Sequence, residues 1–137
     1  MSKLRIAFDI GGVLSAHPEL RTLFDVCQAS DAVEVFIVTD MPNDAALAML
    51  QQNAIRIAPE RVLSADYAKH GGACKAVVCE NHKIAVMLDD AINYACTGSF
   101  LRLLVMPMVE RPYYSDDWKV PSESGNFGRA RFHGANR

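Results

Sequence analysis

Apolar residues gather into five short runs, separated by stretches of mixed character. The runs cover residues 4–10, 35–38, 61–63, 84–88 and 100–106. Short runs that are rich in β-branched residues and do not alternate with polar ones are typical of strands buried on both faces of a parallel sheet. The pattern therefore predicts a mostly parallel sheet of about five strands.

Helical patterns lie between these runs. After Pro18, apolar side chains recur at the spacing of one helix face, at Leu20, Leu23, Phe24 and Cys27. Residues 44–52 are rich in Ala, Leu and Met, a third pattern follows Gly71 and Gly72, and a short helix is expected at 91–96. Alternating strands and helices predict an α/β, Rossmann-like three-layer sandwich, with helices on both faces of the sheet.

The domain organisation follows from where this pattern stops. Residues 1–106 carry the alternation and form one predicted α/β core. Residues 107–137 are rich in Pro, Gly, Ser and charged side chains, and their apolar residues follow neither the spacing of a helix nor that of a strand. We expect this tail to pack on or near the rim of the active site, with aromatic anchors at Tyr113, Tyr114, Trp118 and Phe127.

Composition narrows the functional classes. Half of the residues are hydrophobic and 22% are charged, which is typical of a globular protein. The net charge is −2, so no strong electrostatic field favours binding to nucleic acid or to a membrane surface. No apolar stretch approaches the length of a membrane span, and the first residues lack the long apolar region of an export signal. The four cysteines form no CxxC pair, so we expect free thiols and a cytoplasmic protein.

Three of the apolar runs end at small polar residues. The first ends at Asp9, the second at Thr39 and Asp40, and the fourth at Asp89 and Asp90. Ligands of parallel sheets bind outside the carboxyl ends of the strands, so we expect the strand of Asp9 to lie between those of Thr39 and Asp89. A single aspartate in a turn more often caps local backbone, but three strand ends together favour a site for Mg²⁺ and a phosphate.

In their order, these motifs resemble those of the haloacid dehalogenase (HAD) superfamily. FDIGGVL at 8–14 resembles its first motif, IVTD at 37–40 its second and AVMLDD at 85–90 its fourth, and the resemblance covers about residues 4–106. It implies that Asp9 is a nucleophile that forms an aspartyl-phosphate and is also a Mg²⁺ ligand. The other implied ligands are the Gly11 carbonyl, Asp89 and Asp90.

The resemblance also implies the residues that bind the phosphoryl group. Thr39 would bind it directly, with Asp40 and Gly12 beside the substrate. The family's third motif contributes a lysine, for which Lys69 and Lys75 are the two candidates. We favour Lys69 as the third catalytic residue because it precedes a predicted helix, whereas Lys75 lies inside that helix.

The chain departs from the family pattern in two respects. Phosphatases of this family usually have a second aspartate two residues after the nucleophile, which protonates the leaving group, and here that position is Gly11. Such general acid–base help is worth about 10² to 10⁴ in rate, and His17, His70 or a residue of the tail would have to replace it. The intervals between motifs also leave no room for a cap domain, which suits a large or nucleotide-like phosphorylated substrate, or closure by a second copy of the chain.

Three functions are compatible with these residues. The first is a Mg²⁺-dependent, HAD-type phosphohydrolase that acts on phosphomonoesters, with slow turnover because of Gly11. The second is a catalytically degenerate protein of the same fold that binds a phosphate or a partner. The third is a receiver-type signalling domain, which we disfavour because its acidic pair follows the first strand rather than the fourth.

Overall fold

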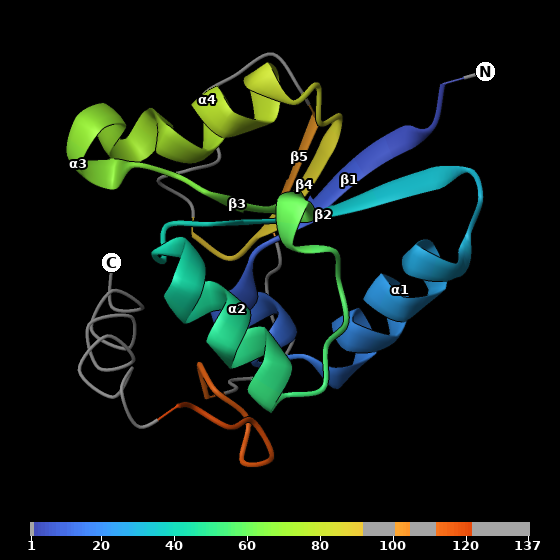
Figure 1. The fold of residues 1–137 in the computed structure, drawn as a ribbon, viewed down its shortest axis with the longest axis vertical. Helices are drawn as coiled ribbons and strands as arrows, with labels where there is room; N and C mark the ends of the chain where they lie inside the picture. Colours follow the sequence, from blue (N-terminus) through green and yellow to red (C-terminus); the bar gives the residue numbers. More distant parts are fainter. Residues whose placement is uncertain (1, 92–100, 105–111, 122–137) are drawn as a thin grey trace.

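Five parallel strands form one sheet in the computed structural model, which describes residues 2–91, 101–104 and 112–121 (Figure 1). The strands are β1 (Leu4–Phe8), β2 (Val33–Thr39), β3 (Val62–Ser64), β4 (Val86–Asp89) and β5 (Leu101–Leu104). Their order is β3-β2-β1-β4-β5, and each neighbouring pair is parallel. The predicted α/β class with a parallel sheet is confirmed, and β1 lies between β2 and β4 as expected.

Helices lie on both sides of this sheet. Figure 1 shows α1 (Pro18–Ala29) and α2 (Asn43–Gln52) on one side, with α3 (Tyr67–His70) and α4 (Cys74–Asn81) on the other. The strand β1 ends two residues earlier than predicted, because the chain enters a turn there, η1 (Ile10–Leu14), in which Gly11 and Gly12 are not helical. The helix predicted at 91–96 lies almost wholly outside the described residues.

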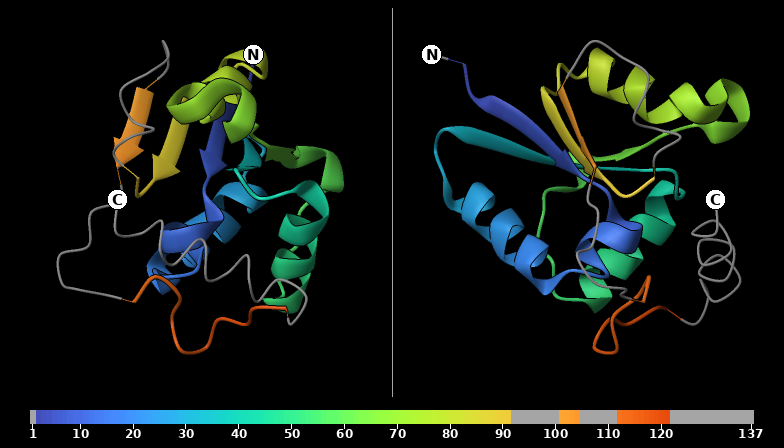
Figure 2. Two further views of the ribbon diagram at one scale, coloured as in Figure 1. Left: turned by 90° about the vertical axis from the view of Figure 1, so that its left-hand side faces the viewer. Right: turned by 180° about the vertical axis from the view of Figure 1, so that it is seen from behind.

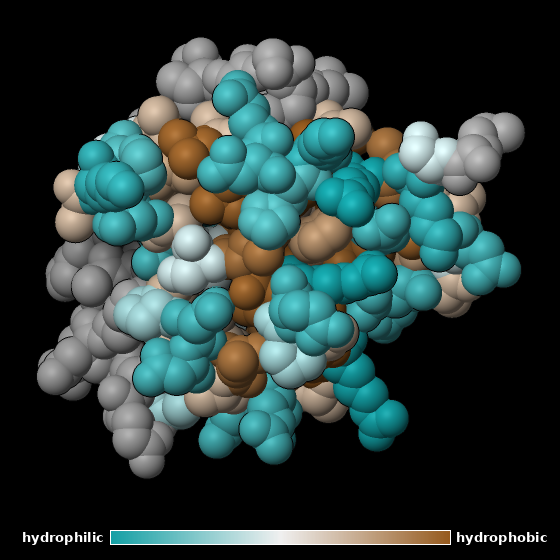
Figure 3. Space-filling view, turned by 45° about the horizontal axis from the view of Figure 1, so that its top comes forward, coloured by the Kyte–Doolittle hydropathy of each residue, from teal (hydrophilic) through white to brown (hydrophobic). Residues whose placement is uncertain are grey.

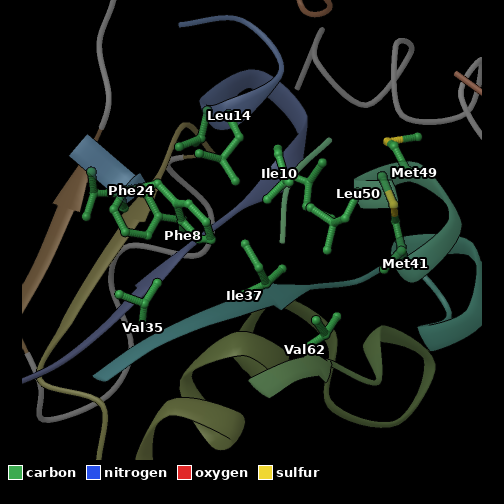
Figure 4. Close-up of a cluster of buried hydrophobic side chains, with 14 of the residues drawn as sticks. Phe8, Ile10, Leu14, Phe24, Val35, Ile37, Met41, Met49, Leu50 and Val62 are labelled. Atoms are coloured by element: carbon green, nitrogen blue, oxygen red, sulfur yellow. The ribbon is translucent and has the colours of Figure 1, made fainter. Parts of the chain in front are cut away.

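A hydrophobic core on each face of the sheet explains the continuous apolar runs. Along β1, Ile6 and Phe8 belong to the cluster shared with α1 and α2, whereas Ala7 belongs to the cluster shared with α4. In the larger cluster the ring of Phe8 meets that of Phe24 edge to face, with 5.3 Å between ring centroids (Figure 4). Strands that are buried on both faces read as unbroken apolar sequence, so the local pattern and the packing agree.

The segment 112–121 packs against this core. Trp118 is buried in the larger cluster, and the Lys119 N–H donates to the Asn53 side chain at 2.6 Å. The Asn53 Nδ2 in turn donates to the Lys119 carbonyl at 2.6 Å, which ties the segment to the end of α2. Tyr113 is buried as well, while the fourth predicted anchor, Phe127, lies outside the described residues.

Charged side chains stay at the surface almost throughout. Figure 3, tilted so that the α3–α4 side comes forward, shows mostly hydrophilic residues with apolar ones between them. Among residues whose burial is described, the buried Asp, Glu, Lys and Arg side chains are Asp9, Lys75 and Asp89. Within the same part of the chain, no helix is long and apolar enough to cross a membrane.

Candidate functional site

The strand register brings the polar strand ends to one edge of the sheet. Phe8 pairs with Ile37 on β2 and with Leu88 on β4. Asp9 and Asp89 are the next residues after the pair Phe8 and Leu88, so they lie side by side at the ends of β1 and β4. The Asp9 N–H continues this pairing and donates to the Leu88 carbonyl at 3.0 Å. Figure 2 (left) shows that β1, β4 and β5 point the same way, toward the end of the molecule crossed by the orange segment 112–121.

A buried lysine joins the two aspartates. Lys75 Nζ lies 2.9 Å from Asp89 Oδ2 and 3.2 Å from Asp9 Oδ2, and all three side chains are 0% exposed. The other oxygen of each carboxylate accepts a main-chain N–H at 2.9 Å, from Ile10 for Asp9 and from Ala91 for Asp89. Both carboxylates are therefore held in fixed orientations by the protein.

A third carboxylate completes an acidic cluster. One oxygen each from Asp9, Asp89 and Asp90 lie within 4.8 Å of one another. Opposite ligands of an octahedral Mg²⁺ site are about 4.2 Å apart at the usual ligand distance of about 2.1 Å, so a small adjustment would let these oxygens hold the ion. With Lys75 the four groups carry a formal charge of −2, which a divalent cation would neutralise. The residues therefore fit the implied metal.

The lysine of the site is not the one that we favoured from sequence. Lys69 is exposed on α3, where its backbone N–H donates to the side chain of Asp66. Lys75 is fully buried in the first turn of α4. The structure brings Lys75, rather than the predicted Lys69, to Asp9 and Asp89, because the helix that precedes β4 starts at Cys74. Lys75 lies four residues before the buried Cys79 and therefore shares its helix face.

Residues predicted to bind phosphate lie at the same edge. Thr39 is fully buried at the end of β2, and its Oγ1 accepts the N–H of Met41 at 3.1 Å, which leaves the hydroxyl proton to donate. Asp40 follows it and is half-buried. The Gly12 N–H donates to Ser15 Oγ at 2.8 Å, so this group holds the turn together and is already engaged.

The two glycines after Asp9 are required for different reasons. Gly12 has φ +74°, a conformation that favours glycine, and an added Cβ would also overlap the carboxylate of Asp90. Gly11 has φ −68° and ψ 129°, which any residue adopts, so backbone freedom does not explain it. A Cβ on Gly11 would instead lie 2.7 Å from ring carbons of Tyr113, far inside the contact distance of about 3.5–4.0 Å.

Ser15 fastens the segment that carries Tyr113 to the turn after Asp9. Its hydroxyl donates to the Tyr113 carbonyl at 2.7 Å, and its carbonyl accepts the N–H of Ser115 at 2.8 Å. Ser15 is buried, and no local pattern indicates its role, because Tyr113 and Ser115 lie about a hundred residues later in the chain. The ring of Tyr113 is thereby held over the two glycines of the turn.

The histidines considered as proton donors lie in other environments. His17 is buried before α1, with its Nδ1 3.7 Å from a carboxylate oxygen of Glu19. His70 is exposed at the end of α3. Cys74 directly precedes Lys75 in α4. Burial and, to a smaller extent, the charge of Asp40 raise the pKa of its thiol, although Lys75 opposes them, so this thiol stays protonated at neutral pH.

Comparisons with protein-family models, with curated proteins and with solved structures found no match to this chain.

Proposed function

We propose that the chain is a Mg²⁺-dependent phosphohydrolase of the HAD type without a cap domain, acting on phosphomonoesters through an aspartyl-phosphate on Asp9. The observation that carries this proposal is the placement of buried charge. Asp9, Lys75 and Asp89 are fully buried and lie together at the carboxyl edge of the sheet. Burying charged groups is costly, so a cluster of this kind is more readily explained by chemistry than by stability.

Each residue of the cluster would have a distinct part in the reaction. An Asp9 oxygen would attack phosphorus, Lys75 would offset charge on the phosphoryl oxygens, and the Thr39 hydroxyl would donate to one of them. Asp89 and Asp90 would hold Mg²⁺ together with Asp9 and the Gly11 carbonyl. When bound, the ion would supply further charge compensation for the phosphoryl group.

The order and layout of the elements support the capless, Rossmann-like part of the proposal. From β1 to β4 the chain is described throughout, and it forms only the strands of the sheet and the helices that pack on it. A protein without a cap would suit a large or nucleotide-like phosphorylated substrate. The second candidate function, phosphate or partner binding without turnover, is favoured by one observation, the absence of a carboxylate at Gly11.

The proposal is tested with an aryl phosphate and Mg²⁺. We expect Mg²⁺-dependent hydrolysis by the natural chain, loss of activity in Asp9→Asn, and no change in Asp31→Asn, which alters an exposed aspartate far from the site. In calorimetry, Asp89→Asn should weaken Mg²⁺ binding more than Asp90→Asn does. Normal binding of Mg²⁺ and of a phosphate mimic without any turnover would favour the non-catalytic function, and equal Mg²⁺ binding in Asp89→Asn would reject the metal site.

A further inference from the structure

The space at residue 11, where relatives of the proposed kind have their acid, is filled by another side chain. Tyr113 is 7% exposed, and its hydroxyl oxygen is the atom nearest to the position of a Cβ on Gly11. Ring atoms of the same tyrosine lie 2.7 Å from that position and 3.0 Å from a Cβ on Gly12. The phenol therefore occupies the volume into which a side chain at residue 11 would project.

Tyr113 is also held firmly relative to Asp9. On one side, Ser15 binds both the Tyr113 carbonyl and the N–H of Ser115, and it accepts the N–H of Gly12 in the turn that follows Asp9. On the other side, Trp118 is buried in the core that Phe8 shares. Because Phe8 precedes Asp9 directly, both attachments fix the phenol against the element that carries the proposed nucleophile.

We propose that the Tyr113 hydroxyl donates its proton to the leaving group, as the catalytic residue that takes the place of the absent carboxylic acid; this rests on the proposed phosphohydrolase function. A phenol carries a proton at neutral pH and is a good hydrogen-bond donor. Its oxygen lies beside the turn that follows Asp9, next to the position that the Cβ of a side chain at residue 11 would take.

The first half-reaction balances with Asp9, Tyr113, the substrate and one water molecule. An Asp9 oxygen forms a bond to phosphorus, the bond from phosphorus to the ester oxygen breaks, and the departing oxygen takes the proton of Tyr113. The tyrosinate then regains a proton from a water molecule, and the hydroxide ion that remains passes to solvent. In the second half-reaction a protonated phenol cannot act as a base toward water, whereas a carboxylate can. Hydrolysis of the aspartyl-phosphate should therefore be the slower half, and the phosphorylated enzyme should accumulate.

The decisive variant is Tyr113→Phe, which keeps the ring and its packing and removes the donor. The matched control is Tyr114→Phe, because the neighbouring ring is in edge contact with that of Tyr113, with 5.0 Å between centroids. Each protein is assayed with Mg²⁺ on an aryl phosphate and on an alkyl phosphate. In parallel, the Asp9 peptide is examined for phosphate by mass spectrometry after an acid quench.

We expect Tyr113→Phe to lower kcat/KM for the alkyl phosphate by about 10²-fold and to leave the aryl phosphate nearly unchanged, since an aryl leaving group departs without a proton. Tyr114→Phe should match the natural chain on both substrates, and phosphorylated Asp9 should be detected in the natural chain. Equal effects of Tyr113→Phe on both substrates, or none, would overturn the role of Tyr113 while the phosphohydrolase function stands. A gain on both substrates in Tyr113→Ala would show that the ring blocks the site, and would overturn it too. No turnover and no phosphorylated Asp9 in the natural chain would overturn both proposals.

Discussion

Replacing Lys75 with methionine should destabilise the fold strongly, and the loss should shrink when Mg²⁺ is added. The ammonium lies 2.9 Å from one carboxylate oxygen and 3.2 Å from another, with all three side chains fully buried. At an effective dielectric constant of about 20, each contact is worth about 5 to 6 kcal/mol of Coulomb attraction. Most of this is offset by the cost of taking the three charges out of water.

Removing only the cation leaves Asp9 and Asp89 buried without that compensation, so the net effect is large. Loss of one partner from a buried ion pair typically costs about 3–5 kcal/mol, and we expect a reduction of this size in the free energy of unfolding of Lys75→Met. Methionine nearly matches the length of the lysine stem, so little of the loss should come from a cavity. At a Mg²⁺ concentration about 100 times the variant's Kd, binding would stabilise the variant by about 2.7 kcal/mol. The natural chain gains as well, so the loss shrinks by the amount by which the variant, which lacks the lysine's positive charge, binds Mg²⁺ more tightly.

Urea denaturation with and without Mg²⁺ measures both effects. The single tryptophan, Trp118, is buried in the core and reports unfolding by its fluorescence. Lys69→Met is the matched control, because this exposed lysine should change stability by no more than about 0.5 kcal/mol. A Lys75→Met protein as stable as the natural chain, or a Lys69→Met protein equally destabilised, would refute the assignment of the buried lysine.

Three further predictions concern the surroundings of the site. Gly12→Ala should weaken Mg²⁺ binding in calorimetry and lower stability by about 1–2 kcal/mol, because φ is +74° there and the new methyl group would displace Asp90. Asn53→Ala should speed hydrogen exchange of the Lys119 amide and cost about 1–3 kcal/mol in urea denaturation, since two backbone groups of Lys119 lose their partner. Burial raises the pKa of the Cys74 thiol, so above the ordinary thiol value of 9.0 the unfolded state releases a proton that the folded state keeps, and the free energy of unfolding falls as pH rises. Cys74→Ala should make this fall smaller when urea denaturation is compared at about pH 8 and about pH 10.

The sheet and its acidic edge could be predicted from sequence because both depend on local pattern. Continuous apolar runs indicate strands buried on two faces, and the observed register places the ends of β1, β2 and β4 side by side. A parallel sheet with short connections allows few strand orders, so Asp9, Thr39 and Asp89 had to meet once the strands were identified. These predictions needed no knowledge of side-chain packing.

The lysine could not be chosen correctly, because the choice depends on one turn. Gly71 adopts φ +59° and ends α3, so the chain starts α4 afresh at Cys74 and brings Lys75 to the sheet. From the sequence, Lys69 stands before the predicted helix and Lys75 inside it, and we favoured the residue that precedes the helix. Helix boundaries are the least certain part of a sequence-based prediction, and here the identity of a site residue depended on one.

The role of Gly11 required a contact that sequence alone does not reveal. Considered locally, a glycine beside an aspartate suggests a flexible turn, and the missing carboxylate suggests a loss of function. The structure relates this glycine to Tyr113, about a hundred residues later, since a side chain at residue 11 and the phenol would occupy the same space. Gly11→Asp alone would therefore collide with Tyr113 rather than restore an acid. Only one of the two positions can carry a large side chain, so Tyr113 can lie against this turn only because residue 11 is a glycine.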